Sequence, residues 1–127
     1  MLLGTGVDII NIENFRRIIN KSGERFINRV FTPTEINYCA KKVNRIQHLA
    51  ARFACKEAIS KALKMGWGNG LNWKEIEIMN NHNGDPKIQL TGQAKRRAGC
   101  LKVADIQISL SHCSEYAVAM AVILKRR

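Results

Sequence analysis

Residues 44–66 constrain the fold most, because they form one long amphipathic helical pattern. We expect Asn44 to cap this helix with Gln47 at the third helical position, and we expect Gly66 to end it in a left-handed turn. At 3.6 residues per turn, the helix carries one apolar stripe consisting of Ile46, Leu49, Ala50 and Phe53. A helix of this kind needs a sheet or other helices to cover its stripe.

Glu57 falls inside this apolar stripe, and Lys61 follows it by one turn. A buried carboxylate is costly unless it is paired or binds a cation. Glu57 and Lys61 have the spacing of a simple ion pair, which usually decorates a solvated helix face. The alternative is a metal-binding carboxylate beside a lysine that faces phosphate. The helix pattern alone leaves both interpretations open.

The first residues predict a strand from Leu2 to Ile9, in which Asp8 is a second carboxylate in apolar company. Asp8 or Asn11 is also placed to cap the helix predicted over 12–20, so a capping role for Asp8 stays open. This helix has Ile12, Phe15 and Ile19 on its inner side, and a further helical turn or two follows over 24–30.

Cations dominate the outer side of these two helical segments. They are Arg16, Arg17, Lys21, Arg25 and Arg29, against only Glu13 and Glu24. A charge run is usually a solvated face, but a one-sided patch of this kind predicts a docking surface for an acidic partner. We assign that role to Arg16, Arg17, Lys21 and Arg25.

The next helix start is explicit in the sequence. Thr32 is the expected cap, Pro33 takes the first helical position, and Glu35 completes a capping box. Glu35 is therefore given a structural role. The helix is expected to reach about Lys42.

The second half of the chain predicts mainly strands. A hairpin over 73–79 and 87–90 turns at Asn83-Gly84, and Thr91 caps a short helix to about residue 101. Strands are expected over 106–111 and 116–124, with His112 between them as either a turn histidine or a donor to a phosphate. The fold class is α+β, with an antiparallel sheet packed against a long central helix and shorter helices, in a single domain over residues 1–127.

Composition limits the partners without choosing one. The net charge of +11 suits nucleic acid, an acidic protein or a polyphosphate ligand. A nucleic-acid-binding module leaves a carboxylate on the apolar helix face unexplained, and aromatic residues make up only 6% of the chain. No apolar run approaches about 18 residues, so we expect no membrane span. A non-catalytic structural subunit is a third possibility.

The cysteines and the first residues indicate the compartment. Four widely spaced cysteines without a Cys-x-x-Cys pair predict reduced thiols, and no spacing supports a zinc site. The early Asp8 and the lack of a basic leading segment argue against a secretory signal. We therefore expect a cytoplasmic protein.

Three segments together resemble the holo-acyl carrier protein synthase family, the small bacterial 4′-phosphopantetheinyl transferases. They are Gly6-Val-Asp-Ile9, Phe31-Thr-Pro-Thr-Glu35 and Arg52-Phe-Ala-Cys-Lys-Glu-Ala-Ile-Ser-Lys61. Ile108-Ser-Leu-Ser-His112 followed by Tyr116-Ala117 adds a fourth match near the end. Each is short, but their order and spacing cover nearly the whole chain.

The resemblance implies transfer of the phosphopantetheine arm of coenzyme A to a serine of apo-acyl carrier protein, with release of 3′,5′-ADP. It implies that Asp8 and Glu57 hold Mg²⁺, that Lys61 lies at the phosphates, and that the assembly is a homotrimer with sites between subunits. Glu57 is the candidate acceptor of the serine proton. Arg52, Lys61, Gly66 and His112 are the candidate coenzyme A contacts.

The resemblance further implies a role in fatty acid synthesis and predicts no nucleic acid or membrane partner. The chain departs from the family pattern in two places. Cys55 stands where the family usually has alanine, which exchanges one small residue for another. The glycine pattern over 66–70 is less compact than usual, which leaves contacts to the pantetheine arm open.

Overall fold

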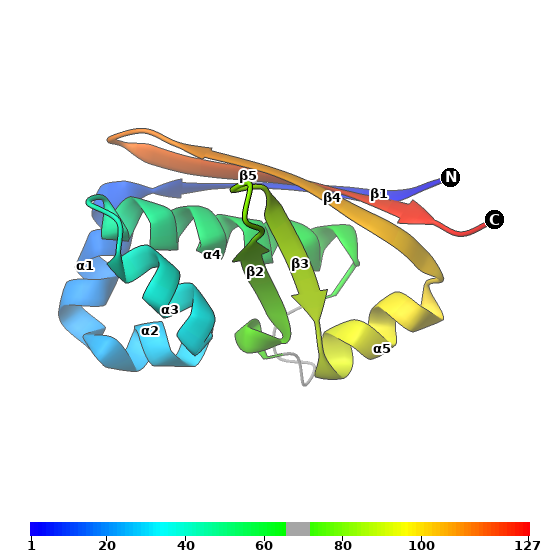
Figure 1. Ribbon diagram of the computed structural model, residues 1–127, viewed down its shortest axis with the longest axis horizontal. Helices are drawn as coiled ribbons and strands as arrows, with labels where there is room; N and C mark the ends of the chain where they lie inside the picture. The colour runs from blue at the N-terminus through cyan, green and yellow to red at the C-terminus, as the bar shows by residue number, and fades with distance from the viewer. Residues whose placement is uncertain (66–71) are drawn as a thin grey trace.

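A computed structural model describes residues 1–65 and 72–127 (Figure 1). Its helices are α1 (Ile12–Ser22), α2 (Glu24–Val30), α3 (Pro33–Ala40), α4 (Arg45–Ala62), the short 3₁₀ helix η1 (Trp73–Glu75) and α5 (Gly92–Cys100). Its strands are β1 (Leu2–Asn11), β2 (Ile76–Asn80), β3 (Pro86–Leu90), β4 (Val103–His112) and β5 (Tyr116–Lys125). None of the described helices has the length and apolarity that crossing a bilayer requires.

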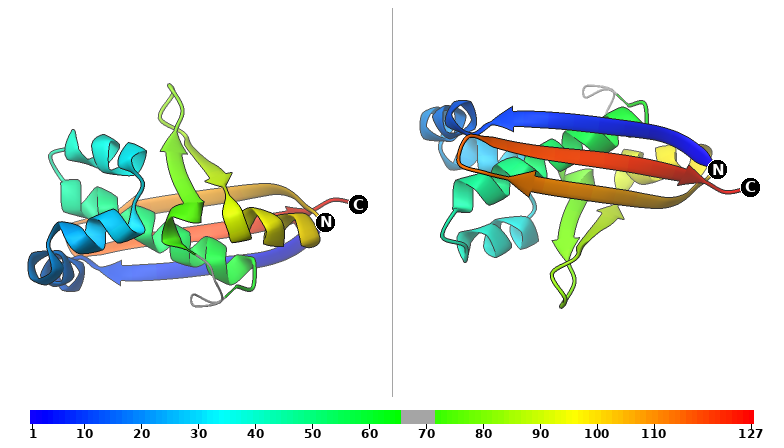
Figure 2. Two further views of the ribbon diagram at one scale, coloured as in Figure 1. Left: turned by 90° about the horizontal axis from the view of Figure 1, so that it is seen from below. Right: turned by 90° about the horizontal axis from the view of Figure 1, so that it is seen from above.

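A three-stranded antiparallel sheet with the order β1-β5-β4 is the framework of the fold. The central strand is β5. Its Ala119 lies opposite Asp8 of β1, and its Ala117 lies opposite His112 of β4. Helix α4 covers one face of this sheet, and Figure 2 (right) shows the opposite face uncovered. The β2–β3 hairpin is a separate two-stranded sheet. The predicted α+β architecture is confirmed.

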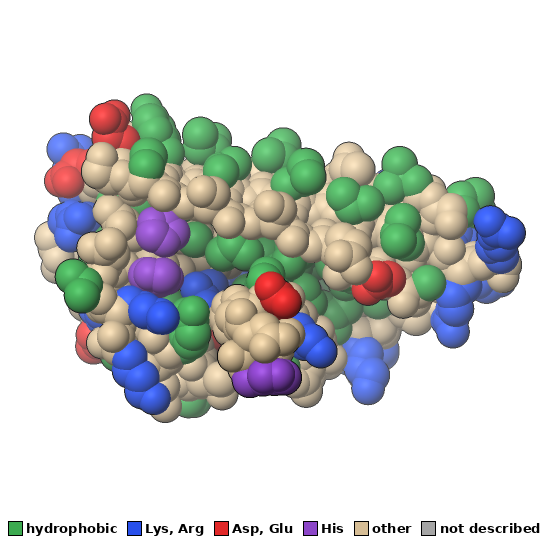
Figure 3. Space-filling model, turned by 45° about the horizontal axis from the view of Figure 1, so that its top comes forward, with side chains coloured by type: hydrophobic (Ala, Val, Ile, Leu, Met, Phe, Trp, Pro, Cys, Tyr) green, Lys and Arg blue, Asp and Glu red, His purple; other side chains and the backbone are tan. Residues whose placement is uncertain are grey.

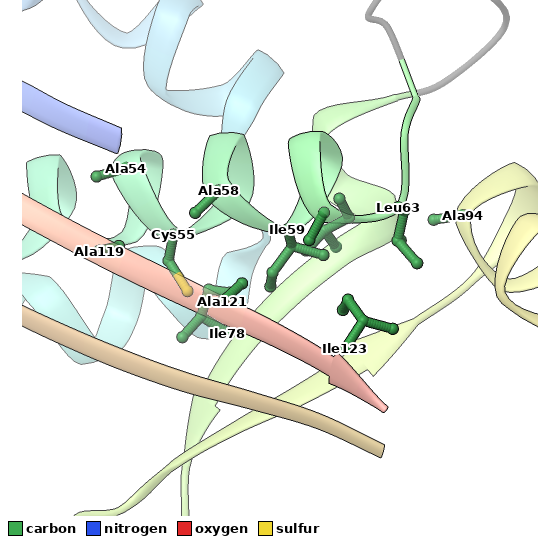
Figure 4. Packing of buried hydrophobic residues seen from close by; sticks show 12 residues of the cluster. Ala54, Cys55, Ala58, Ile59, Leu63, Ile78, Ala94, Ala119, Ala121 and Ile123 are labelled. Carbon is green, nitrogen blue, oxygen red and sulfur yellow. The ribbon is translucent and has the colours of Figure 1, made fainter. Parts of the chain in front are cut away.

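Small side chains allow α4 to pack closely on the sheet. Ala54, Ala58 and Ile59 of α4 face Ala119 and Ala121 of β5 in one buried cluster (Figure 4). A second cluster joins the first half of α4 to α1, α2 and α3 through Phe15, Ile27, Phe31 and Leu49, among others. Helix α4 therefore contributes to both clusters, which explains why its buried side is much wider than one apolar stripe.

The edge strand β1 lies directly on the backbone of α4. A Cβ atom at Gly4 would lie 2.6 Å from the carbonyl oxygen of Ala62, and one at Gly6 would lie 2.0 Å from that of Ala58. Only glycine fits at such distances. Because Gly4 meets Ala62 and Gly6 meets Ala58, β1 runs antiparallel to α4, and the next side chain on this face belongs to Asp8.

The helix starts agree with the sequence in two cases. Asn11 caps α1 by accepting a 2.9 Å hydrogen bond from the Asn14 amide, so Asp8 does not have the capping role. The predicted capping box of Thr32 and Glu35 is present at the start of α3. Glu35 also has a larger structural role, described below.

The predicted ends of α4 were wrong in detail. Asn44 occupies the cap position, but its side chain caps nothing, because its backbone (φ −100°, ψ 57°) is not in the extended conformation that aims a capping side chain inward. The helix ends before Gly66, which lies outside the described residues. Lys64 adopts the left-handed conformation (φ 58°), and the Lys64 and Met65 amides donate to the Lys61 and Ser60 carbonyls.

Two expectations in the second half are also corrected. Residues 73–75 form η1 instead of strand, because the Asn72 side chain accepts a hydrogen bond from the Lys74 amide and turns the backbone. Thr91 does not cap α5 with its side chain. The Glu75 carboxylate takes that place and accepts two 3.1 Å contacts from the Gln93 amide. All four cysteines are free, as expected.

The close approach of β1 to α4 generates a stability prediction. Gly6→Ala should lower the free energy of unfolding by about 2–4 kcal/mol, because the added methyl group forces the strand off the helix. Gly99→Ala is the matched control, since a Cβ at Gly99 meets nothing within 4 Å. That change should shift stability by no more than about 1 kcal/mol, in the stabilising direction. Urea unfolding of both variants measures the difference, and equal effects would contradict the packing described.

Candidate functional site

Asp8 and Lys61 meet where β1 crosses α4. The Lys61 Nζ atom donates to the Asp8 Oδ1 atom at 3.0 Å and to the Val7 carbonyl oxygen at 3.1 Å. The Asp8 side chain is 17% exposed, whereas that of Lys61 is 53% exposed. Lys61 therefore bridges the strand to the helix while its cationic end stays open to solvent and to a ligand.

The second carboxylate oxygen of Asp8 has no such partner. The Asp8 Oδ2 atom is buried and makes no hydrogen bond to any described residue. An unsatisfied buried carboxylate oxygen is costly, and a hard divalent cation is the ligand that best satisfies it. The donor chemistry at Asp8 therefore fits Mg²⁺. Among the described residues no three histidine, cysteine or acidic side chains cluster around a common metal position.

Glu57 lies on the same side of α4 as Lys61, one turn toward the start of the helix. Its side chain is half-buried, not enclosed within the stripe as the sequence suggested. Gly4 lies against Ala62 and Gly6 against Ala58, so later residues of β1 lie beside earlier residues of α4. By this register, Glu57 lies level with the part of β1 between Gly6 and Asp8.

Lys56 of α4 carries a fully enclosed charge, and the sequence analysis did not single it out. The Lys56 Nζ atom forms a 2.9 Å ion pair with the Glu35 Oε1 atom, and both side chains have 0% exposure. Lys56 also donates to the carbonyl oxygens of Trp73 and Ile76, and Glu35 accepts from the Ile78 amide. Burial lowers the pKa of Lys56, and Glu35 opposes this change. The pair locks α3, α4 and β2 together immediately beside Glu57.

Arg52 and His112 line a second location, a pocket of about 300 Å³ between α4, β4 and the β2–β3 hairpin. Arg52 is only 2% exposed. Its guanidinium lies 4.3 Å from the centre of the Tyr38 ring and donates to the Asn80 Oδ1 atom at 2.5 Å. The Arg52 Nε atom is buried without a hydrogen-bond partner.

These two locations lie on opposite sides of α4. Lys61 follows Arg52 by nine residues, which corresponds to about 180° around a helix. Asp8 belongs to β1 and His112 to β4, which are the two edges of the three-stranded sheet. One chain thus brings Asp8 and Lys61 together and, separately, Arg52 and His112. Gly66, the remaining predicted contact, lies outside the described residues.

The predicted docking residues are exposed on α1 and α2 at the end of the molecule remote from α5 (Figure 1). Arg16 and Arg17 share Glu13 at 3.7 and 3.8 Å, and Glu24 pairs with Arg45. In the described part of the chain, Lys21 and Arg25 have no ion pair. The acids of this surface are therefore already engaged, and its net charge is positive.

Comparisons with known proteins show the family of the chain. The family model described as the 4′-phosphopantetheinyl transferase superfamily matches residues 4–121. A holo-[acyl-carrier-protein] synthase from Ruminiclostridium cellulolyticum is 48% identical over 97% of this chain and 91% of its own length.

Two solved structures of such synthases are similar over nearly their full lengths. The one from Neisseria meningitidis has a TM-score of 0.89 at 28% identity, covering 98% of this chain and all of that one. The one from Bacillus anthracis, in complex with CoA (3′,5′-ADP), has a TM-score of 0.80 at 30% identity and covers 99% of both chains.

Proposed function

Since the chain belongs to the holo-acyl carrier protein synthase family of 4′-phosphopantetheinyl transferases, we propose that it moves the phosphopantetheine arm of coenzyme A to a serine of apo-acyl carrier protein. The products are 3′,5′-ADP and the holo-carrier. The observation that carries this proposal is the position of Asp8, which lies against α4 beside Lys61 with one buried oxygen unsatisfied.

Asp8 and Glu57 are the residues that would hold Mg²⁺. Mg²⁺ commonly takes one or two protein carboxylates and completes its coordination with water and substrate phosphate oxygens. When bound, Mg²⁺ would neutralise the negative charge that develops on the diphosphate of coenzyme A. The two acids come from β1 and α4, so the packing of the strand on the helix sets their separation.

The side chains of this chain supply the remaining chemistry. Glu57 accepts the proton of the carrier serine as the serine oxygen attacks the β-phosphorus of coenzyme A. Lys61, a compact charge with an exposed end, binds the diphosphate and stabilises the departing 3′,5′-ADP. The contact of Lys61 with Asp8 keeps the lysine oriented toward the reacting phosphates.

The separation of the two locations supports a site shared between copies of the chain, and the resemblance to the family supports a homotrimer. A single coenzyme A cannot easily contact Lys61 and Arg52 of one chain, because α4 lies between them. If two copies adjoin, Lys61 of one and Arg52 of the other can face the same ligand. The uncovered sheet face supplies a surface for such assembly, with exposed apolar residues that include Val7 (59%), Ile9 (63%) and Met120 (50%). Figure 3 shows hydrophobic side chains gathered along this face.

Arg52 and His112 are assigned to phosphates of coenzyme A, and Gly66 to its pantetheine arm by resemblance alone. The basic surface of α1 and α2 docks the carrier, which is acidic in this family. We also propose that residues 1–127 act as a single domain in the cytoplasm and that the holo-carrier serves fatty acid synthesis. The resemblance to the family supports these three statements.

The transfer itself is tested by incubating the protein with Mg²⁺, coenzyme A and apo-carrier, and by reading the carrier mass. A mass increase by one phosphopantetheine group is expected. Asp8→Asn and Glu57→Gln should each lower kcat/KM by at least about a hundredfold, because each removes a charge from the reacting centre. Asp85→Asn, an exposed acid in the β2–β3 turn, is the control. Unchanged turnover in the Asp8→Asn/Glu57→Gln double variant would refute the assignment.

The docking surface gives a separate prediction. Reversing charge in Arg17→Glu/Lys21→Glu should raise the KM for carrier roughly tenfold and leave the KM for coenzyme A nearly unchanged. Lys95→Glu/Arg96→Glu on α5, at the other end of the molecule, is the matched control and should change neither value (Figure 1). Steady-state kinetics with each substrate varied in turn provide the measurement. An equal effect on both substrates would show that these residues do not dock the carrier.

A further inference from the structure

The pocket that contains Arg52 also contains a pair of histidines. His48 lies on α4 one turn before Arg52, and its ring centre is 4.7 Å from that of His112 in an edge-to-face arrangement. The Arg52 Nη1 atom donates to the His48 carbonyl oxygen at 3.4 Å. Two imidazoles and one guanidinium thus line one small cavity. Figure 3 shows two neighbouring histidine side chains on this face of the molecule.

The charged and titratable groups that face His48 from the packed elements are all basic. His112 comes from β4, Arg52 from α4 itself, and Lys42 from the segment after α3, where it lies 4.8 Å from the centre of the Tyr38 ring. The described residues that line the pocket include no aspartate or glutamate. Burial lowers the pKa of His48, and the positive neighbours His112, Arg52 and Lys42 lower that pKa further. Without a ligand, His48 is therefore neutral near neutral pH.

A phosphate monoester has the complementary chemistry. It carries a charge of about −1.5 to −2 at neutral pH and has three strong acceptor oxygens. Arg52 lines the pocket, and its buried Nε atom has no hydrogen-bond partner among the described residues. The His48 imidazole donates from both ring nitrogens when it is protonated, and the anion offsets the penalty of placing that charge beside Arg52.

The position of the pocket indicates which phosphate it holds. This step rests on the proposed function. The reacting diphosphate belongs with Asp8, Glu57 and Lys61, and none of these three residues lines the pocket, whichever copy of the chain supplies it. The phosphate that reaches His48 and His112 is therefore the one that does not react, the 3′-phosphate of coenzyme A.

We propose that His48 determines specificity for the 3′-phosphate of coenzyme A, acting with His112 and Arg52, and that it strengthens this recognition as the pH falls. The sign follows from linkage. Binding the anion favours protonated His48, so the complex binds more protons than the free protein, and affinity rises toward lower pH. The effect spans about pH 8 to about pH 6.5, because below about pH 6 the phosphate itself takes up a proton.

The test compares ligands that differ only in the 3′-phosphate. Calorimetry gives the Kd values of 3′,5′-ADP and 5′-AMP, and steady-state kinetics give kcat/KM for coenzyme A and 3′-dephospho-coenzyme A. In the unaltered protein, the preference for the 3′-phosphorylated ligand should grow about three- to tenfold from pH 8 to pH 6.5. Comparing the two ligands cancels titration of the groups that they share.

Three variants separate recognition from packing. His48→Phe keeps an aromatic ring against His112 and should remove most of the pH dependence, with about a tenfold loss of preference at the lower pH. His48→Gln keeps a donor that does not titrate, so part of the preference should return without the pH dependence. His82→Phe, in the exposed hairpin turn, is the control and should behave as the unaltered protein.

The outcomes distinguish this inference from the proposed function. If His48→Phe shows the same preference as the unaltered protein at every pH, the role of His48 is refuted even when transfer to the carrier is normal. If the pH-dependent preference depends on His48 in calorimetry but no carrier is modified, the proposed function fails and the phosphate site stands. If the Kd of 5′-AMP equals that of 3′,5′-ADP and changes equally with pH, the assignment to the 3′-phosphate is overturned.

Discussion

The contact of β1 with the backbone of α4 is the constraint on which the rest of the structure depends. Gly4 and Gly6 let the strand approach the Ala62 and Ala58 carbonyls more closely than any side chain would permit. That approach brings the Asp8 carboxylate onto the helix beside Lys61, although 53 residues separate them in sequence. A carboxylate on a strand and a carboxylate on a helix can share one cation only if these two elements are held at a fixed separation.

Helix α4 contributes candidate site residues from two opposite sides. One side presents Glu57 and Lys61 toward β1, and the other presents His48 and Arg52 toward β4. Lys56 fixes the orientation of the helix through Glu35 and through carbonyls of the η1–β2 segment, so each side keeps its own neighbours. A ligand that needs both sides therefore needs two copies of the chain, and the apolar face of the sheet is available for that assembly.

The sequence predicted most of the framework, because periodicity and capping residues are local signals. The capping box at Thr32, the hairpin turn at Gly84 and the amphipathic α1 are all encoded within a few neighbouring residues. The pairing of Lys56 with Glu35 could not be read in this way, since a lysine inside a helical pattern looks solvent-exposed until α3 and β2 are in place. The left-handed Lys64 and the cap of α5 by Glu75 depend likewise on tertiary contacts. Asp8 and Glu57 stood out in the sequence as carboxylates in apolar company, and the resemblance gave them a shared role. The packing of β1 on α4 supports that proposal.

We propose that Asp8 and Glu57 of one chain bind a single divalent cation against the diphosphate of coenzyme A. Electron paramagnetic resonance of Mn²⁺, titrated into the protein with coenzyme A present, measures this most directly. We expect one bound ion per chain in the unaltered protein and a loss of tight binding in both Asp8→Asn and Glu57→Gln. Undiminished Mn²⁺ binding in both variants would contradict this proposal.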